Sequence, residues 1–374
     1  MKERFAAFLA LALCCLFPVQ GVSAGREIVY GFDGDYPPHT FIRDGKPEGF
    51  DIDVLRAILE NRDATVVYKP LQWAEVQEDL RRGTVHMTSG MAKTKEREAL
   101  YLFPAPPLSD LRISLFSSDR GGVRFLSGLE GKRVATQKGS LYQKILEERG
   151  VTPVLYQTEA DALQALVRGD ADAFAGSEDT AFYNLREKGW TGVYPVSTPL
   201  RASTLHYAVR KGDTELLGIL NEGLERIRKN GTLDRLYRQW FVTELTEEEI
   251  GRLRKEAEAA VRFAYAPYSG IQGGAAVLGF SGKAYRGCTV ENALSSCTTG
   301  AVQAAVLNAA ASGETRFRGV LSLLPGGGTA VPGAQERQIL CEFGRETLVV
   351  LDDGQGGVRT VMVSELLPFS CRAE

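Results

Sequence analysis

Histidine is scarce in this chain of 374 residues. The three histidines are His39, His86 and His206, so the part of the chain beyond residue 206 contains none. Charge of one sign is also lacking, because 44 lysines and arginines stand against 47 aspartates and glutamates and leave a formal net charge of -3. This balance gives no reason to expect nucleic acid as a partner.

Long apolar runs are missing after residue 24, so we expect no transmembrane helix in the rest of the chain. The earlier run, Phe5 to Val19, is short for a membrane span and follows the positively charged Lys2 and Arg4. Val22-Ser23-Ala24 then supplies the small residues of a cleavage site. We therefore predict that residues 1–24 are a signal peptide and that the protein is periplasmic or otherwise extracytoplasmic.

Cysteine is uncommon, with 6 in the chain. Cys14 could mark a lipoprotein, but such signals place a small residue before the cysteine, and the large Leu13 disfavours lipidation. Four cysteines follow the predicted signal peptide, all near the C-terminus: Cys288, Cys297, Cys341 and Cys371. An even number in an exported protein permits disulfides, with three possible pairings, and buried thiols are the alternative.

The composition that remains is that of a globular protein, with 44% hydrophobic and 24% charged residues over a length that suits two or three domains. Apolar residues at helical spacing predict helices at Phe50–Leu59, with Asp51 as its N-cap, and at Trp73–Arg82. Short strands are expected at Val66–Tyr68 and His86–Met91. Strands that alternate with helices indicate a parallel α/β sheet with a site outside the strand ends.

Four short motifs follow one another in this region: Y-P-P-x-x-F from Tyr36, G-F-D-I-D-V from Gly49, W-x-E-V from Trp73 and G-M-x-x-T-x-E-R from Gly90. Together they resemble the family 3 bacterial extracellular solute-binding proteins over roughly residues 28–241. The resemblance implies a two-lobed periplasmic-binding-protein fold (type II). The W-x-E-V form also looks like the binding domains of bacterial sensor proteins, so the resemblance implies either ABC-type uptake or sensing.

The resemblance divides the binding domain, residues 25–242, into two lobes. Lobe 1 is expected at 25–116 and 206–242, and lobe 2 at 117–205. Two crossover strands would form a hinge and a cleft that closes on a ligand. The further elements expected are Ile113–Phe116, Val134–Gln137, Leu141–Arg149, Glu159–Arg168, Ala171–Ala175, His206–Val209, Glu215–Asn230 and Thr232–Phe241.

The same resemblance assigns ligand-binding roles to several residues. Tyr36 and Trp73 match aromatic positions that clamp a ligand, although Trp73 could equally be a core residue. Arg97 matches an arginine that grips a ligand carboxylate, since its guanidinium suits two carboxylate oxygens. Asp33 and Gly90 fall on further contact positions of the family.

Other positions depart from the pattern of amino-acid binders. Ser177 stands where an aspartate usually pairs with the ligand's amino group, and Ala92 where a hydroxyl residue is usual. Gln137 replaces a basic residue found in some members. Gln137 and Ser140 precede a helix start that could receive an anion, and a plain strand-to-helix turn is the alternative. A small ligand with an anionic group is therefore a safer expectation than an amino acid.

A second domain is predicted at residues 243–374. Thr246 to Glu249 forms a capping box that starts a helix running to about Ala264. Three later stretches, A-Y-A-P-Y-S from Ala264, G-A-A-V-L from Gly274 and G-C-T-V-E-N-A from Gly287, resemble the cytidine deaminase family over roughly residues 245–369. The resemblance implies a smaller three-layer α/β/α cytidine deaminase-like domain, and such domains are commonly oligomeric.

The zinc chemistry of that family is not matched. A zinc deaminase needs three Cys or His ligands and a catalytic glutamate. The first ligand and the glutamate fall on Gly300-Ala301-Val302, and the other two ligands on Gly333 and Glu336. We therefore predict no catalytic residue, metal or cofactor here, with Glu291 as a possible residual nucleoside contact.

Taken as a whole, the sequence predicts an extracytoplasmic binding protein for a small, carboxylate-bearing or amino-acid-like ligand, fused to a non-catalytic deaminase-like domain. Its partners would be an ABC transporter permease or a membrane sensor, and a second copy of the chain through the C-terminal domain. The alternatives are a nucleoside deaminase or nucleoside-binding protein with an exported sensor domain, and a purely structural assembly protein.

Overall fold

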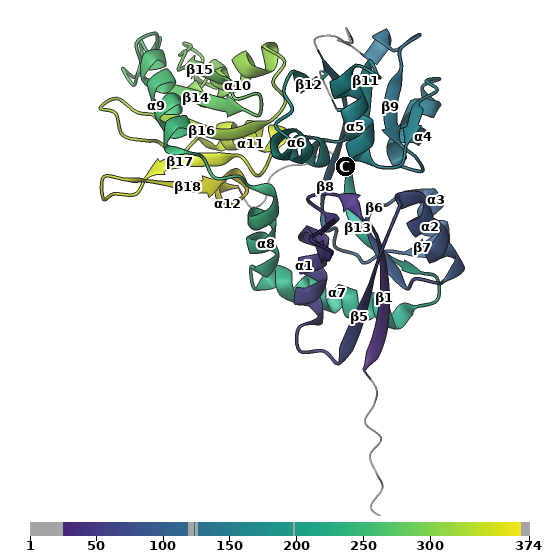
Figure 1. Cartoon of the computed structure of the whole chain (residues 1–374). Coiled ribbons are helices and arrows are strands. Elements are labelled where there is room, and N and C mark those ends of the chain that lie inside the picture. Colours follow the sequence, from purple (N-terminus) through teal and green to yellow (C-terminus); the bar gives the residue numbers. More distant parts are fainter. Residues whose placement is uncertain (1–24, 119–122, 124–125, 197–198, 368–374) are drawn as a thin grey trace, which may run out of the picture.

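The computed structural model describes residues 25–118, 123, 126–196 and 199–367. The predicted signal peptide and Cys371 lie outside these residues. Figure 1 shows two lobes of one module stacked on each other, with a third body beside the upper lobe. No helix among the described residues is long and apolar enough to cross a bilayer.

Lobe 1 is built on three strands that follow the expected order. In the centre, β1 (Arg26–Asp33) pairs in parallel with β5 (Ala64–Leu71), from Arg26 opposite Ala64 to Asp33 opposite Leu71, and with β6 (Met87–Ala92). The helices are α1 (Phe50–Leu59), α2 (Trp73–Arg82), α3 (Lys95–Leu100), α7 (Thr214–Lys229) and α8 (Thr232–Phe241). The remaining strands are β2 (Asp35–Tyr36), β3 (Thr40–Arg43), β4 (Lys46–Glu48) and β7 (Tyr101–Leu102).

The predicted N-cap of α1 is wrong. Gly49 takes that place with φ of 126°, because a side chain there would collide with the backbone of His39. Asp51 lies instead inside the first turn, fully buried, with its Oδ1 3.6 Å from His39 Nδ1. The residue therefore belongs to the interior and not to the helix cap.

The described part of lobe 2 contains four strands and three helices around its own apolar core. The strands are β9 (Val134–Gln137), β10 (Val154–Tyr156), β11 (Ala173–Ser177) and β12 (Val193–Pro195). The helices are α4 (Leu141–Glu148), α5 (Glu159–Arg168) and α6 (Glu178–Glu187), and a short 3-10 turn covers Leu126–Gly128. Apolar residues of α5 pack with Phe116 and Phe174, which places α5 against the sheet.

Two long strands join the lobes. They are β8 (Ser109–Ser118) and β13 (Arg201–Arg210), which pair antiparallel from Arg201 opposite Ile113 to Leu205 opposite Ser109. Through this pair the strands of both lobes form one 10-stranded sheet. Leu111 and Leu205 lie within the paired segment, so the connection between the lobes also forms the floor of the space between them.

The C-terminal domain is a 5-stranded sheet in the order β15-β14-β16-β17-β18. The strands are β14 (Gly274–Gly279), β15 (Ala284–Cys288), β16 (Phe317–Leu323), β17 (Leu348–Asp352) and β18 (Val358–Met362). Residues of α9 (Glu247–Val261) pack in one apolar cluster, and those of α10 (Ala301–Ala311), α11 (Ala334–Phe343) and α12 (Val363–Leu366) pack in another. Helices therefore cover both faces, and the predicted α/β fold class is confirmed.

The capping box that starts α9 is present, since Thr246 Oγ1 accepts from Glu249 N at 3.2 Å and Glu249 Oε2 accepts from Thr246 N at 3.0 Å. The helix ends at Val261 and not near Ala264. Ala264 belongs to the turn that leads to Tyr265, which bridges to Val290. The helix is shorter because this pairing draws the chain toward the sheet edge.

A buried arginine joins the C-terminal domain to lobe 2. Arg316, directly before β16, is 5% exposed, and its guanidinium contacts Glu346 of its own domain. It also lies 2.6 Å from Asp179 Oδ1 and 3.7 Å from Glu178 Oε2, both at the start of α6. Burial lowers the pKa of Arg316, but Glu346, Asp179 and Glu178 more than offset this and leave it raised. The guanidinium therefore stays charged inside the interface.

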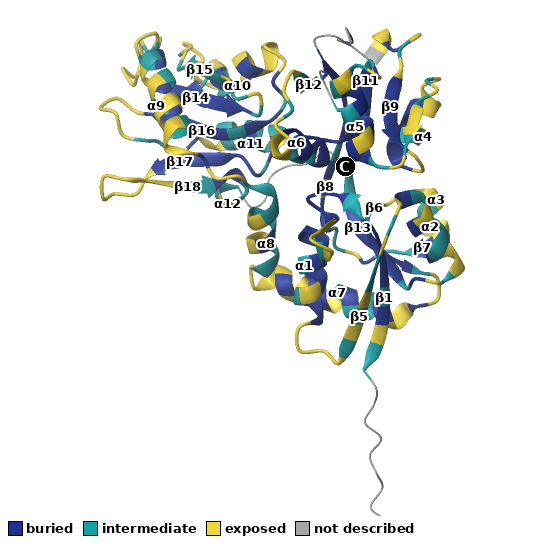
Figure 2. Cartoon of the chain, in the orientation of Figure 1, coloured by how far each residue is buried: buried dark blue, intermediate teal, exposed yellow. Residues whose placement is uncertain are grey.

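Further contacts at this interface come from both bodies. Arg112 of β8 pairs with Glu178 at 3.1 Å and donates to the carbonyl of Glu342 at 2.9 Å. The rings of Phe182 and Phe280 lie 4.6 Å apart, centre to centre. Figure 2 shows mainly buried and intermediate residues along α6, which lies between the two bodies.

The contacts between the C-terminal domain and lobe 1 are more exposed. Arg238 of α8 lies 3.4 Å from Glu365 and donates to Thr360 at 3.2 Å, and its side chain is 31% exposed. Water screens such pairs, so they contribute little to the free energy of association. The C-terminal domain is therefore held more firmly by lobe 2 than by lobe 1.

Candidate functional site

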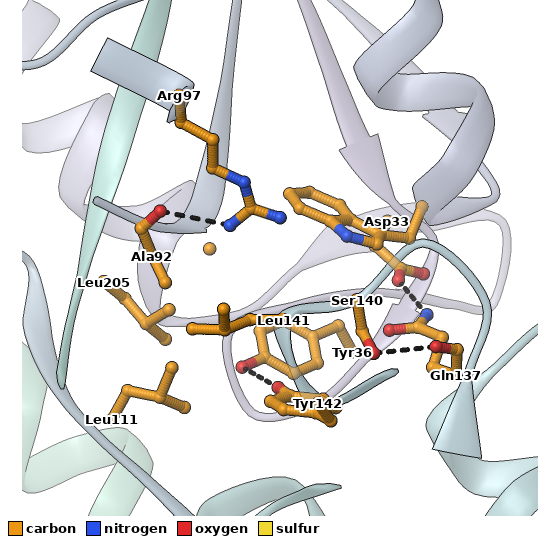
Figure 3. Close-up of a pocket in the computed structure, with 12 residues that line it drawn as sticks. Asp33, Tyr36, Ala92, Arg97, Leu111, Gln137, Ser140, Leu141, Tyr142 and Leu205 are labelled. Atoms are coloured by element: carbon orange, nitrogen blue, oxygen red, sulfur yellow. Dashed lines mark hydrogen bonds between the residues drawn. The ribbon is translucent and has the colours of Figure 1, made fainter. Parts of the chain in front are cut away.

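The two lobes meet around a small pocket of about 20 Å³, which has room for about one water molecule while the lobes are in contact. Figure 3 shows side chains from lobe 1, lobe 2 and both connecting strands directed into this space. It is lined by Asp33, Tyr36, Trp73, Gly90, Ala92, Arg97, Leu111, Gln137, Ser140, Leu141, Tyr142 and Leu205. Seven of the eight predicted ligand-binding residues are therefore brought together, and the eighth, Ser177, lies outside the lining.

Arg97 provides a cation that faces the pocket. It is the third residue of α3, and Thr94 caps this helix by accepting the Arg97 N–H at 3.3 Å. The guanidinium donates to the carbonyl of Ala92 at 3.0 Å and to Gln77 Oε1 at 3.3 Å. Among the described residues it forms no ion pair, and burial lowers its pKa. Since a half-buried cation without an ion pair favours an anion, this group can receive a ligand carboxylate.

Trp73 lies in the pocket wall and in the core at the same time. It begins α2, is 7% exposed and packs with Val76 and Leu80. The Arg97 guanidinium lies 5.7 Å from the centre of its ring, within the range of a cation–π contact. The core role and the site role of Trp73 are thus compatible, because the ring packs with core residues and also lines the pocket.

Asp33 and Gln137 meet across the two lobes. Gln137 Nε2 donates to Asp33 Oδ2 at 2.7 Å, and the backbone N–H of Asp35 donates to Asp33 Oδ1 at 3.1 Å. Burial raises the pKa of Asp33 to about 6, against the opposing effect of these two hydrogen bonds. The carboxyl is therefore a group whose charge depends on what else enters the pocket.

Tyr36 packs against a glycine that its ring requires. A side chain at Gly90, where φ is 64°, would begin 3.1 Å from Tyr36 Cε1. The other face of the Tyr36 ring stacks on His39 at 4.8 Å, and its hydroxyl lies 3.3 Å from that of Tyr142 in lobe 2. These contacts fix the ring at the boundary between the lobes.

Ser140 and Ser177 both cap or begin helices in lobe 2. Ser140 Oγ accepts from Gln143 N at 3.2 Å and donates to the carbonyl of Gln137 at 2.7 Å, so the residue caps α4. This capping favours the plain strand-to-helix turn that the sequence left open. Ser177 is fully buried at the N-cap of α6, and its backbone N–H donates to Glu159 Oε2 at 3.0 Å.

The neighbours of Ser177 do not supply a carboxylate to the pocket. Glu178 and Asp179 face Arg316 and Arg112 in the domain interface. Ser114 Oγ also lies 2.6 Å from Glu178 Oε1. These two acids therefore stabilise the interface and are directed away from the cleft.

Several lining residues were not predicted. They are Leu111, Leu141, Tyr142 and Leu205, together with Ala92, which the sequence noted only as a departure. Apart from Ala92, which lies inside the G-M-x-x-T-x-E-R motif, they belong to no motif, and they come together only because α4 and the connecting strands meet in three dimensions. Glu159, behind Tyr36 and Tyr142, was likewise missed, since its only sequence signal was a place in a helix.

The lobes touch each other directly, as in a closed cleft. Besides the Asp33–Gln137 bond, Gln77 Nε2 donates to the carbonyl of Gly139 at 3.1 Å. Lys144 Nζ lies 2.9 Å from Glu96 Oε1, and Arg43 donates to the hydroxyl of Tyr183 at 2.6 Å. A ligand would have to enter while these contacts are broken, so entry requires the lobes to part.

The C-terminal domain has a second candidate site, where the deaminase resemblance placed zinc ligands. Gly300 and Gly333 are the N-caps of α10 and α11. Between them lies the carboxylate of Glu336, which accepts the N–H of Val302 at 2.9 Å and that of Gly333 at 2.8 Å. A side chain at Gly300 would begin 2.3 Å from Glu336 Oε1. One carboxylate thus links the starts of both helices.

Other groups in this domain are arranged for structure. Glu291 accepts the N–H groups of Tyr268 and Ser269, at 2.8 and 3.2 Å, and also contacts the Ser269 hydroxyl. The Ser269 side chain and these N–H groups lower the pKa of Glu291. Cys288 and Cys297 carry free thiols. No group of three or more His, Cys, Asp or Glu residues that could hold a metal occurs among the described residues.

Comparison with known families matches both parts of the chain. The family of bacterial extracellular solute-binding proteins, family 3, matches residues 28–243. The cytidine and deoxycytidylate deaminase zinc-binding region matches residues 224–321. The fusion expected from the motifs is therefore confirmed.

Individual relatives match the binding module. The ABC transporter arginine-binding protein 1 of Escherichia coli (strain K12) is 29% identical over 230 residues, which are 59% of this chain and 93% of that protein. The L-cystine-binding protein TcyJ of the same organism is 24% identical and covers 59% of this chain and 84% of that protein. A histidine kinase sensor domain with similarity to periplasmic binding proteins is 34% identical, with a TM-score of 0.55, over 58% of this chain and 96% of that one.

Proposed function

This chain belongs to the bacterial extracellular solute-binding proteins of family 3, and from that premise we propose that it captures a small carboxylate-bearing ligand of the amino-acid type. The ligand would enter between the parted lobes. Arg97 would bind its carboxylate, and Tyr36 and Trp73 would cover it as the lobes close. The other proposed ligand contacts are Asp33, Gly90, Gln137 and Ser140. Ser177 is buried outside the pocket lining and would hold its neighbours in place.

The observation that carries this proposal is the Arg97 guanidinium, directed into an enclosed pocket without an acidic partner among the described residues. A half-buried guanidinium without an anion has lost part of its hydration, and a bidentate carboxylate would satisfy both its charge and its donors. The curated relatives are named for arginine and L-cystine, which agrees with a ligand of this class.

Delivery of the ligand would take place outside the cytoplasm, after export by residues 1–24. An ABC transporter permease would receive it, as the name of the arginine-binding relative suggests. The resemblance to a histidine kinase sensor domain supports a membrane sensor as the other partner. Binding studied with each partner would separate uptake from sensing.

We propose further that the C-terminal domain does not deaminate nucleosides. The positions that match zinc ligands hold Gly300, Gly333 and Glu336, and the position of the catalytic glutamate holds Val302. The Glu336 carboxylate is engaged by backbone N–H groups from both helices. The domain would instead pack on lobe 2 and provide contacts for self-association. Metal analysis tests the rival deaminase, which requires about one zinc ion per chain.

A thermal-shift screen of the chain from Gly25 onward tests the main proposal. The screen compares amino acids, small carboxylates and nucleosides, each at a high concentration. A ligand present at 100 times its Kd adds about 2.7 kcal/mol to the free energy of unfolding. We expect a hit among amino acids or carboxylates that Arg97→Ala abolishes. A hit among nucleosides alone, unchanged in Arg97→Ala, would instead place the binding function in the C-terminal domain.

A further inference from the structure

Glu159 is a buried carboxyl that no motif predicted. It is the first residue of α5 and is 1% exposed. Its Oε2 accepts the N–H of Ser177 at 3.0 Å. Its Oε1 accepts no hydrogen bond of good geometry from the described residues, although the Tyr142 hydroxyl lies beside the carboxyl. Because buried charges in proteins are normally paired, an acid in this position calls for a partner from elsewhere.

The carboxyl lies directly behind the pocket wall. Tyr36 and Tyr142 line the pocket. Burial is the main cause that raises the pKa of both hydroxyls, and the charge of Glu159 is the next. Asp33, a third lining residue, in turn raises the pKa of Glu159. Glu159 is therefore close enough to the pocket for its charge to act on what is bound there.

The groups around Glu159 provide no cation. The chain packs α5 against β2, β8, β9, β10, β11 and α6. The titratable groups that these elements and α4 turn toward Glu159 are Asp33, Asp35, Tyr36 and Tyr142. The acids Glu178 and Asp179 of α6 face Arg316, and Arg112 of β8 faces Glu178. In the described part of the chain, neither Asp33 nor Glu159 forms an ion pair.

We propose that Glu159 is a specificity-determining residue which, together with Asp33, selects ligands that carry an ammonium or guanidinium group besides their carboxylate. The inference rests on the proposed function. Arg97 would hold the negative end of such a ligand. The two acids would provide the negative field for its positive end, at the side of the pocket formed by Tyr36 and Tyr142.

Closure of the lobes gives this selection its physical basis. Glu159 and Tyr142 belong to lobe 2, and Asp33 and Tyr36 belong to lobe 1, so closure brings the two carboxyls and the two hydroxyls together. Burial raises the pKa of Glu159 to about 8 and that of Asp33 to about 6. Closure without a cation must therefore bury a charge or take up a proton from solvent. A cationic ligand removes this cost, and a neutral one does not.

Calorimetric titration of the chain from Gly25 onward tests the inference. The probes are the twenty standard L-amino acids and, for the tightest binder, its 2-hydroxy acid, in which a hydroxyl replaces the ammonium group. We expect the wild type to prefer the amino acid. In Glu159→Gln, the affinity for the amino acid should fall about 10- to 100-fold, the loss expected for a charged hydrogen-bonding partner. The preference over the hydroxy acid should shrink accordingly.

Asp161→Asn is the matched control, since Asp161 is an exposed acid in the same first turn of α5. It should bind both probes as the wild type does. A Glu159→Gln protein that keeps the wild-type preference overturns the inference and leaves the proposed function intact. A wild type that binds no amino acid overturns the proposed function, and this inference with it.

A measurement on the wild type alone covers the case in which Glu159→Gln fails to fold. The closed lobes hold more protons than the parted lobes, because burial raises both carboxyl pKa values. Small-angle X-ray scattering of the ligand-free protein should therefore show a radius of gyration that increases between pH 5 and pH 9. A saturating amount of the tightest-binding amino acid at pH 9 should reverse the increase. A radius that is independent of pH and ligand contradicts the inference.

Discussion

Replacement of Arg316 by methionine should weaken the joint between lobe 2 and the C-terminal domain. The new side chain keeps part of the packing between Phe182 and Phe280, whose rings lie 5.7 and 5.3 Å from the guanidinium. It removes the charge that faces Glu178, Asp179 and Glu346. These acids would then lie close together in a buried place, where like charges repel.

The expected loss follows from the burial of these groups. Removal of one partner of a buried ion pair costs about 3–5 kcal/mol. Here Glu178 keeps Arg112 as a partner, and Asp179 is 15% exposed and can be hydrated, so the lower end, about 3 kcal/mol, applies. With a urea dependence of about 1–3 kcal/mol per molar, the unfolding midpoint should fall by about 1–3 M.

Tryptophan fluorescence is the suitable probe, because the three tryptophans, Trp73, Trp190 and Trp240, all lie in the binding module. Their urea midpoint should fall in Arg316→Met, since Asp179, which loses its partner, and Glu178, which keeps only Arg112, belong to that module. Arg318→Met is the control, because Arg318 pairs at 3.1 Å with Glu249 inside the C-terminal domain. It should leave the tryptophan midpoint unchanged. Equal midpoints for the wild type and Arg316→Met would refute the reasoning.

Two further predictions concern single carboxyls. Glu336→Ala should lower the stability of the C-terminal domain by about 1–3 kcal/mol, because two helix-start N–H groups lose their acceptor. Urea titration followed by far-UV circular dichroism measures the loss. An unchanged stability would show that water replaces the carboxylate. The ligand-free chain should lose stability as the pH rises from 5 to 8. The folded pKa values of Asp33 and Glu159, about 6 and 8, lie above their unfolded values of 3.8 and 4.5, so the folded state binds more protons in this range. Urea midpoints at several pH values measure this, and Glu159→Gln should flatten the dependence; an equally steep dependence in that variant would exclude Glu159 as its source.

Helices were the part of the fold that sequence predicted best. The bounds of α2, α5 and α8 agree with prediction because each helix carries an apolar stripe and local end signals. Both cap predictions were tested by the structure. The Thr246 cap is correct, whereas Asp51 lies inside α1 because a buried interior position outweighed its capping preference.

Strand lengths were less predictable, since a strand ends where its partner does. The β-branched run Val66–Tyr68 is only the middle of β5, which extends to Ala64 and Leu71 because β1 offers a partner residue at every position. The same holds for β8, where pairing with β11 and β13 extends the expected four residues to ten. Pairing of this kind depends on segments far apart in sequence.

The residues of the candidate site likewise fall into those that local sequence predicts and those that it does not. Tyr36, Trp73 and Arg97 could be predicted because each belongs to a local motif. Tyr142 and, behind it, Glu159 could not, because their place beside Tyr36 depends on the contact of lobe 2 with lobe 1. The domain interface was also beyond local patterns, since Arg316 and its acidic partners lie far apart in sequence.

Equilibrium dialysis of the chain from Gly25 onward against an equimolar mixture of the twenty amino acids tests the central claim most directly. The retained amino acids are identified by mass and counted per chain. We predict that one amino acid, or a small chemically related group, is retained at about one molecule per chain by the wild type and is lost from Arg97→Ala. Retention of none by the wild type, or equal retention by Arg97→Ala, would contradict a carboxylate-binding cleft built on Arg97.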